Sequence, residues 1–144
     1  MWGRPGSLSG WRSTFEKFPG SVSVAEMGDA RLAGFCCAGP VVDAKRSAPF
    51  EFEIYGLHVA PDMRRRGIGA ALLRAALNRA AREGMSSAIV WTLKELEQSR
   101  SFYAREGGEL VKTGTWHVGR LELPEVAYAW RDLGVPTSGS DGFP

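Results

Sequence analysis

Residues 50–93 constrain the fold most strongly, because a strand, an amphipathic helix and a second strand follow one another there with short connections. The first strand alternates in "FEFEIYGLHV", which places Phe50, Phe52 and Ile54 on one face and Glu51, Glu53 and Tyr55 on the other. Small and apolar residues then recur at helical spacing over 67–83. The apolar run "SSAIVWTL" that follows is typical of a strand buried beside a crossover helix. The segment therefore predicts a βαβ unit within an α/β fold.

Gly56 interrupts the alternation of the first strand of this unit. A glycine inside a strand often marks a β-bulge, or a place where a ligand approaches the backbone closely. We therefore expect backbone hydrogen-bonding groups to be free near Gly56.

The turn that leads into the helix, "PDMRRRGIGAALL", joins consecutive arginines to two glycines. The first N–H groups of a helix have no partners within the helix, and the helix dipole favours negative charge there. Gly67 and Gly69 leave room for an anion at the backbone, and Arg64, Arg65 and Arg66 add positive charge, although Arg65 has even odds of simply facing solvent. The turn therefore predicts an anion-binding site.

Several other functions are not favoured. A P-loop has Lys and then Ser or Thr after its last glycine, whereas Ala70 and Ala71 stand here. The net charge of +2 is too small for a nucleic-acid binder, and no apolar run approaches the roughly 18 residues of a membrane span. Cys36 and Cys37 are neighbours without the spacing of a metal or redox motif. We therefore expect a protein that resides in the reducing cytoplasm and binds no metal.

The rest of the sequence predicts further strands and one more helix. "SVSVAE" and "RLAGFCCAG" form an expected hairpin, "VVDAKRSAP" an expected loop, and 95–106 an expected helix ending at a glycine pair. Two more strands are expected around 109–118 and 126–130. These elements predict one domain over 21–133, with a short lead over 1–20 that holds at most a remnant of a helix, and a disordered tail over 134–144.

The order of elements, the turn "RRRGIGAAL" after "LHVAP" and the segment "WTLKELEQSRSFYAREGG" together resemble the GNAT superfamily of acetyl-CoA-dependent N-acetyltransferases. The signature turn of that family has Arg or Gln, two residues, Gly, one residue, and Gly or Ala, which Arg64, Gly67 and Gly69 match. "SRSFYAREGG" is an independent match, one strand later, to a family pattern like A-R-x-F-Y-x-x-x-G-F. The resemblance implies a mixed, mostly antiparallel sheet with a βαβ unit that binds acetyl-CoA.

The resemblance also implies transfer of an acetyl group from acetyl-CoA to a primary amine of a small molecule or peptide. In the family the pyrophosphate of coenzyme A lies on the signature turn, and the backbone of Leu57, His58 and Val59 corresponds to the segment that pairs with the pantetheine arm and polarises the thioester carbonyl. The residues implied for the pyrophosphate are Arg64, Arg65, Arg66, Gly67, Ile68, Gly69 and Ala70.

Two side chains are implied in the chemistry. Tyr103 matches the family tyrosine that protonates the leaving thiolate, and a phenol with a pKa of about 10 carries its proton at neutral pH. Glu53 stands where several members carry a carboxylate that acts, directly or through water, as the base. Without the surrounding motif, Tyr103 would be read as a core aromatic residue, and Glu53 is nearly as well explained as an exposed strand residue like Glu51. His58 is a further candidate base.

The chain departs from the family pattern in three places. Leu96 replaces an asparagine that contacts the cofactor, and Gly108 replaces the aromatic residue after the helix-ending glycine. We expect residues 1–20 to supply at most a remnant of the first elements of the family, without its first strand and helix, so an acetyl-CoA-binding module without efficient transfer stays open as the alternative function. We also expect the uncovered front of the sheet to be protected by homodimer formation or by the segment with Trp2 and Trp11.

Overall fold

A computed structural model of the chain describes residues 21–26 and 31–134. The predictions for the lead over 1–20 and for the tail beyond Gly134, and the connection between the two strands of the expected hairpin, lie outside these residues. Among the described helices, none is long and apolar enough to span a membrane.

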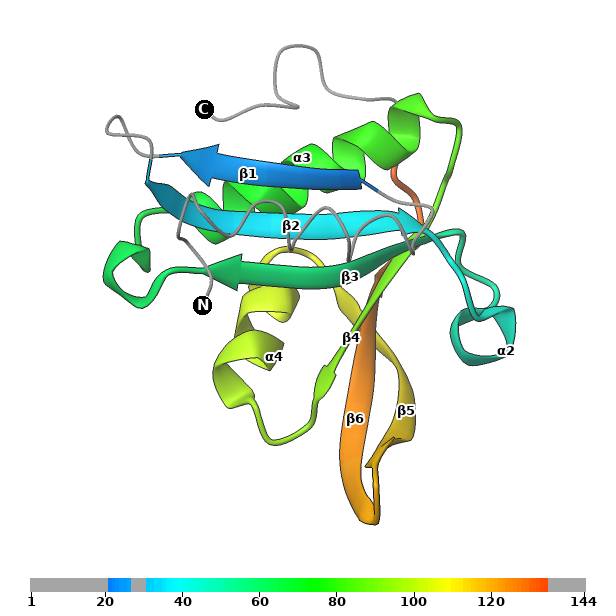
Figure 1. Ribbon diagram of the computed structural model, residues 1–144. Helices are drawn as coiled ribbons and strands as arrows, with labels where there is room; N and C mark the ends of the chain where they lie inside the picture. The colour runs from blue at the N-terminus through cyan, green and yellow to red at the C-terminus, as the bar shows by residue number, and fades with distance from the viewer. Residues whose placement is uncertain (1–20, 27–30, 135–144) are drawn as a thin grey trace.

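Six strands form one sheet in the order β1-β2-β3-β4-β6-β5 (Figure 1). The only parallel neighbours among the described strands are β3 and β4, and the other neighbours are antiparallel. This confirms the predicted mixed, mostly antiparallel sheet with a βαβ unit. The strands are β1 (Ser21–Glu26), β2 (Leu32–Pro40), β3 (Phe52–Val59), β4 (Ala88–Leu93), β5 (Glu109–Val118) and β6 (Leu121–Trp130).

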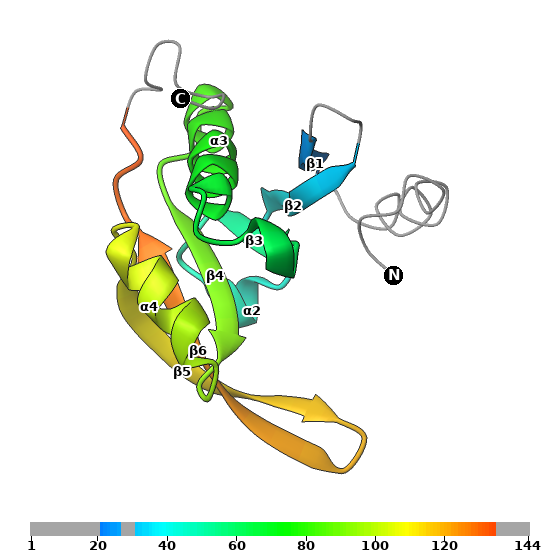
Figure 2. The ribbon, with the colours of Figure 1, turned by 90° about the vertical axis from the view of Figure 1, so that its left-hand side faces the viewer.

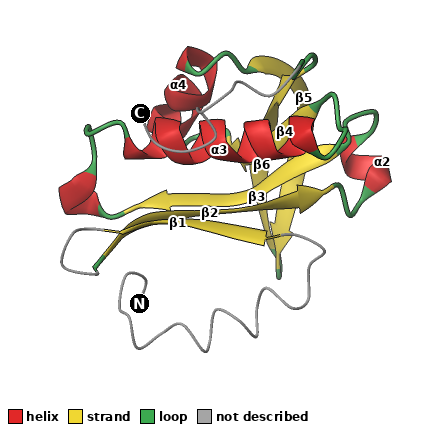
Figure 3. Ribbon diagram, turned by 90° about the horizontal axis from the view of Figure 1, so that it is seen from above, coloured by secondary structure: helices red, strands yellow, loops and turns green. Residues whose placement is uncertain are grey.

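The helical elements lie between the strands along the chain. The short helix α2 (Ala44–Ser47) and the 3-10 turn η2 (Pro61–Met63) flank β3. The long helix α3 (Ile68–Arg82) links β3 to β4, and α4 (Glu97–Arg105) links β4 to β5. Helices α3 and α4 lie on the same face of the sheet, as Figures 2 and 3 show.

Strands β3 and β4 pair over three residues and then separate. Phe52–Ile54 pair with Ala88–Val90, and beyond them β4 turns away from β3 and follows β6 (Figure 1). The register of β2 against β3 slips here, since Ala38 faces Ile54 while Cys37 faces Gly56. The extra residue is a β-bulge, which confirms the interpretation of Gly56 and bends β3 away from β4.

Two apolar clusters lie on opposite faces of the sheet, because neighbouring residues of a strand point to opposite faces. The larger cluster lies under the helices, where Phe52, Ile54, Leu72 and Leu73 are fully buried. The smaller cluster on the far face contains Phe50, Ile89, Ala127 and Ala129.

Four details of the prediction were wrong. The expected loop over 41–49 contains α2, whose first turn is capped by the Asp43 carboxylate accepting from Arg46 N–H at 3.2 Å. Phe50 packs in the far-face cluster, because β3 begins only at Phe52 and the alternation does not extend back to it. Helix α4 starts at Glu97 rather than Glu95, and β6 starts at Leu121, five residues before the predicted Val126. The sequence did not predict the first residues of β6 because polar residues lie among them.

Candidate active site at the splayed strands

The turn between β3 and α3 has the backbone geometry of an anion site. Gly67 is the N-cap of α3 with φ +78, in the left-handed region, and offers no side chain to cap the helix. The first bond of the helix runs from Ala71 N–H to the Gly67 carbonyl, so the N–H groups of Ile68, Gly69 and Ala70 have no acceptor within the helix. Unpaired N–H groups at the positive end of a helix dipole favour an anion.

Side chains around this turn add to the positive charge. Arg64, Arg65 and Arg66 are exposed, and none forms an ion pair with another residue of the part that the structure describes. Arg65 has φ +66, a left-handed conformation that is uncommon outside glycine. Three arginines without an ion pair among the described residues therefore directly precede the N–H groups at the start of α3.

Gly69 also has a packing role that the sequence did not reveal. A Cβ atom at Gly69 would lie 3.4 Å from the ring of Phe102 and 3.6 Å from Val59 Cγ2. The glycine therefore lets α3 approach α4 and the end of β3, which brings the turn close to the place where the strands separate.

The segment Leu57–Val59 of β3 lies just beyond the bulge. These residues pair with Cys36, Phe35 and Gly34 of β2 on one edge, while the pairing of β3 with β4 has already ended at Ile54. The other edge therefore leaves backbone groups available to a ligand lying between the two strands. His58 packs its ring against Phe35 at 5.8 Å, and burial, followed by the nearby Arg64, lowers the pKa of His58 and favours its neutral form.

Tyr103 comes from α4 and lies in the core on the helix face. Only 7% of it is exposed, and its ring neighbours those of Phe102, Tyr128 and Trp130 at centroid distances of 5.2, 6.3 and 6.4 Å. Burial is the main cause that raises the pKa of Tyr103, with a smaller contribution from Cys36. The phenol therefore carries its proton throughout the neutral range.

Glu53 points to the opposite face, since its neighbours Phe52 and Ile54 point into the core under the helices. It is half-buried, and its Oε1 accepts a long hydrogen bond from Ser47 Oγ at 3.4 Å. Burial raises the pKa of Glu53, while Arg46 and Ser47 lower it by less. Glu53 and Tyr103 thus lie on opposite faces of the sheet.

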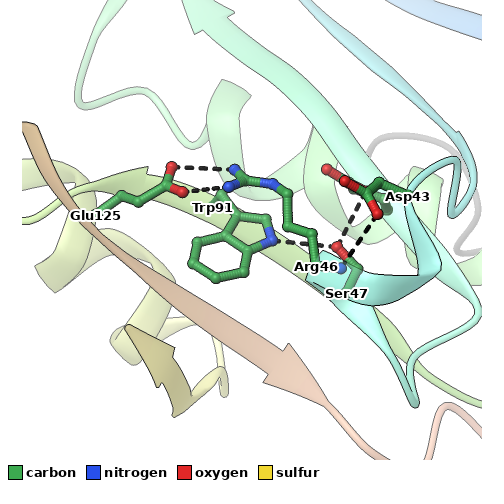
Figure 4. Close-up of polar contacts among 6 residues, drawn as sticks. Asp43, Arg46, Ser47, Trp91 and Glu125 are labelled. Atoms are coloured by element: carbon green, nitrogen blue, oxygen red, sulfur yellow. Dashed lines mark hydrogen bonds and ion pairs between the residues drawn. The ribbon is translucent and has the colours of Figure 1, made fainter. Parts of the chain in front are cut away.

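A polar cluster next to Glu53 was missed by the sequence reading (Figure 4). The Arg46 guanidinium lies 4.1 Å above the Trp91 ring and donates to both carboxylate oxygens of Glu125. Ser47, which is fully buried, accepts from Trp91 Nε1 at 3.2 Å and so links the cluster to Glu53. Arg46, Ser47, Trp91 and Glu125 come from α2, β4 and β6. Only α2 has a local signal in the sequence, because Asp43 lies three residues before Arg46, which is the spacing of a helix N-cap.

This cluster forms part of the wall of an open pocket of about 500 Å³. The pocket lies at α2, β4, β5 and β6, and its lining residues are Lys45, Arg46, Trp91, Lys112, Thr113, Gly114, Thr115 and Glu125. No group of three or more His, Cys, Asp or Glu side chains in the described ranges is placed to hold a metal ion.

Backbone and aromatic neighbours leave no room for a side chain at position 108. A Cβ atom at Gly108 would lie 2.9 Å from the Tyr103 carbonyl oxygen and 3.2 Å from the Trp130 ring. Trp130 Nε1 donates to the Glu106 carbonyl oxygen at 3.0 Å, so its indole fills the space beside the end of α4. Leu96, at the N-cap of α4, is 47% exposed and provides no side-chain cap.

The sequence and the fold also resemble those of known proteins. The sequence model of the acetyltransferase (GNAT) family matches residues 3–108. YuaI of Bacillus subtilis (strain 168), described as an uncharacterized N-acetyltransferase, is 28% identical over 123 residues, which are 85% of this chain and 68% of YuaI.

Solved structures of similar fold include an N-acetyltransferase from Staphylococcus aureus Mu50, with a TM-score of 0.70, 18% identity, and coverage of 90% of this chain and 77% of that one. Another is the ribosomal-protein-alanine N-acetyltransferase from Brucella melitensis, with a TM-score of 0.67, 20% identity, and coverage of 88% and 77%. At these identities the structural matches support the fold alone.

Proposed function

Because the chain belongs to the GNAT family of acetyltransferases, we propose that it transfers an acetyl group from acetyl-CoA to a primary amine of a small molecule or peptide. One observation carries the proposal: the free edge of β3 at Leu57–Val59 leads directly into the arginine and glycine turn at the start of α3. A thioester arm along the strand edge and a pyrophosphate on the turn would then belong to one extended ligand.

The pyrophosphate is assigned to the N–H groups of Ile68, Gly69 and Ala70 and to the arginines before them. Gly67 matters because its left-handed backbone directs these groups outward without a side chain of its own. In this assignment the positive charge of the arginine run neutralises the pyrophosphate of coenzyme A at this one turn.

The chemistry is proposed to use Glu53 and Tyr103. Glu53, acting directly or through water, takes a proton from the acceptor ammonium, and the neutral nitrogen then attacks the thioester carbonyl carbon. Backbone N–H groups of Leu57–Val59 stabilise the negative charge that develops on the carbonyl oxygen. The carbon–sulfur bond breaks as Tyr103 gives its proton to the departing thiolate. The attacking nitrogen loses its second proton as the amide forms; that proton restores the phenol of Tyr103 through solvent, and Glu53 releases the first proton to solvent. Because burial raises the pKa of Tyr103, the phenol carries the proton that this step uses throughout the neutral range.

The alternative is a module that binds acetyl-CoA without efficient transfer. Leu96 favours this alternative, since it presents a half-exposed apolar side chain where the family has an amide that contacts the cofactor. Binding and transfer must therefore be measured separately.

Calorimetric titration with acetyl-CoA and with desulfo-coenzyme A tests binding, and a thiol-release assay against a library of amines and N-terminal peptides tests transfer. We expect saturable binding and thiol release that depends on the added amine. Absence of binding would refute the proposed function, and tight binding with no amine-dependent thiol release would establish the binding module instead.

Two further expectations accompany the proposed function. We propose that the protein works in the reducing cytoplasm, which is supported by Cys36, a buried thiol whose pKa burial raises to about 12. We also propose that it forms a homodimer, for which multi-angle light scattering is the direct measurement.

A further inference from the structure

The pocket beside Glu53 holds uncompensated positive charge. Arg46 lines this pocket, but its guanidinium is already paired with Glu125. Lys45 and Lys112 also line it, and neither forms an ion pair or a side-chain hydrogen bond with any residue within 21–26 and 31–134. Two lysines without an ion pair among the described residues therefore line one open cavity, which favours an anionic ligand.

The pocket is built from a fixed frame. Trp91 is held by its hydrogen bond to Ser47 and by the guanidinium stacked on its ring. Gly114 lets β5 lie close to this frame, since a Cβ atom there would lie 3.3 Å from Trp91 Cζ3 and 3.5 Å from Glu125 Oε2. A cavity of about 500 Å³ whose wall combines an indole with cationic side chains suits a small organic anion better than a bare inorganic ion.

The pocket is also linked to the proposed base. Ser47 Oγ lies 3.4 Å from Glu53 Oε1 and 3.2 Å from Trp91 Nε1, so one side chain separates the carboxylate from the pocket wall. The proposed base and the pocket therefore lie on the same face of the sheet, with Ser47 between them.

We propose that this pocket binds a carboxylate group of the acceptor, so that the enzyme prefers primary amines that carry a carboxylate, such as amino acids or acidic peptides. The inference rests on the proposed function for the identity of the ligand as an acceptor. Lys45 and Lys112 are then specificity-determining residues: they neutralise the carboxylate while the amine lies at Glu53. A carboxylate is favoured over a phosphate because phosphate sites often use the free N–H groups at the start of a helix. Among the described helices α3 and α4 are long enough to offer such a set, and neither lines the pocket.

Succinate tests the pocket without any transfer, because it carries carboxylates and no amine. In two-dimensional ¹H–¹⁵N NMR we expect succinate to shift the Trp91 indole signal and the amide signals of 112–115 saturably, while neutral succinamide leaves them in place. Lys45→Gln and Lys112→Gln should each weaken succinate binding about three- to tenfold. Lys94→Gln is the matched control, because Lys94 is exposed and does not line the pocket.

Transfer to β-alanine and to β-alaninamide then tests the role of the pocket in specificity. We expect a preference for the carboxylate in KM of roughly tenfold, which Lys112→Gln reduces and Lys94→Gln leaves unchanged. Absence of saturable succinate shifts, or tighter binding of inorganic phosphate, would overturn the carboxylate site while leaving acetyl transfer intact. Succinate binding in a protein that acetylates no amine would instead overturn the acceptor role together with the proposed function.

Discussion

Arg46 and Glu125 are 79 positions apart in the sequence and form a bidentate ion pair in which the carboxylate is 5% exposed and the guanidinium 34%. The pair ties the short helix α2 to β6 across the far face of the sheet. A buried carboxylate without its partner is costly, whereas loss of both charges is often tolerated.

Arg46→Met should therefore lower the free energy of unfolding by about 2–4 kcal/mol, toward the low end because Arg46 is partly exposed. The double variant Arg46→Met, Glu125→Met should recover much of this loss. Arg131→Met is the control, since its 3.1 Å pair with Glu109 is exposed on both sides and should contribute less than about 1 kcal/mol. Urea unfolding measures all three variants, and equal losses for Arg46→Met and Arg131→Met would contradict the importance of the buried pair.

As the pH rises through the raised pKa of Glu53, the free energy of unfolding should fall, while turnover should rise because the proposed base acts in its deprotonated form. Its raised pKa means that the folded protein still binds a proton at a pH where the unfolded chain has lost it. The free energy of unfolding therefore falls as the pH rises from the ordinary carboxyl value of 4.5 through the raised value. Glu53→Gln removes this fall, so its stability relative to the wild type should increase over that window, while its turnover drops roughly 10²–10⁴-fold as expected for loss of a general base.

Glu51 provides the control of opposite sign. The N–H and hydroxyl groups of Ser86, each 2.9 Å from Glu51 Oε1, lower the pKa of Glu51. Its contribution to stability is therefore present above the ordinary carboxyl pKa and is lost as the pH falls through the lowered value. Glu51→Gln should lose stability near neutral pH and keep wild-type turnover. Thermal unfolding at several pH values distinguishes the two variants, and the same pH trend in both would contradict the assignment of Glu53.

Gly67 allows a charge test of the proposed coenzyme A site. Its φ of +78 strains most side chains, but Asn and Asp tolerate this conformation, and a Cβ atom at this position would meet no atom of a non-neighbouring residue within 4 Å. Gly67→Asn and Gly67→Asp differ in charge and hardly in size. Calorimetry should show acetyl-CoA binding roughly tenfold weaker for Asp than for Asn, because only Asp repels the pyrophosphate. Equal affinities with similar circular dichroism would place the phosphates elsewhere.

Gly108 should tolerate no side chain. Gly108→Ala brings a Cβ atom to 2.9 Å from the Tyr103 carbonyl oxygen and should cost about 1–3 kcal/mol of stability. At Gly56 nothing lies within 4 Å of a Cβ atom, so Gly56→Ala should be neutral or stabilising by up to about 1 kcal/mol. Chemical denaturation compares the two, and a neutral Gly108→Ala would show that the end of α4 shifts freely.

The parts of the fold that the sequence predicted well have local causes. The spacing of Leu72, Leu73 and Ala76 identifies the buried face of α3, and Gly56 marks the bulge at which β3 leaves β4. In the arginine and glycine turn, Gly67 is a local signal for the left-handed backbone at that position, whereas Arg65, whose φ is also positive, carries no such signal.

The parts that it missed depend on contacts between distant segments. Nothing near Glu125 indicates that Arg46 will neutralise it, because each residue lies in a segment that is polar on its own. Similarly, the indole of Trp130 of β6 occupies the space beside the end of α4 and, together with the Tyr103 carbonyl oxygen, crowds position 108. Such compensation becomes visible only when the strands are placed side by side.

Tyr103→Phe separates binding from chemistry. The substitution keeps the ring among Phe102, Tyr128 and Trp130 and removes only the phenolic proton donor. If Tyr103 protonates the leaving thiolate, acetyl-CoA should bind nearly as before, while turnover with a working amine falls roughly 10²–10⁴-fold. Because a thiolate leaves more readily without a proton as the pH rises, the deficit should lie toward the low end and shrink at alkaline pH.

Tyr128→Phe is the matched control for this prediction. Tyr128 belongs to the same aromatic cluster, is equally buried at 7% exposure, and has its ring 6.3 Å from that of Tyr103. Loss of its hydroxyl should change stability by no more than Tyr103→Phe does and should leave turnover close to the wild-type value. Stopped-flow thiol release from neutral to alkaline pH and calorimetry with acetyl-CoA provide the two readouts. Wild-type turnover for Tyr103→Phe at every pH would make Tyr103 a packing residue, and equal deficits in both variants would trace the effect to the cluster rather than to proton transfer.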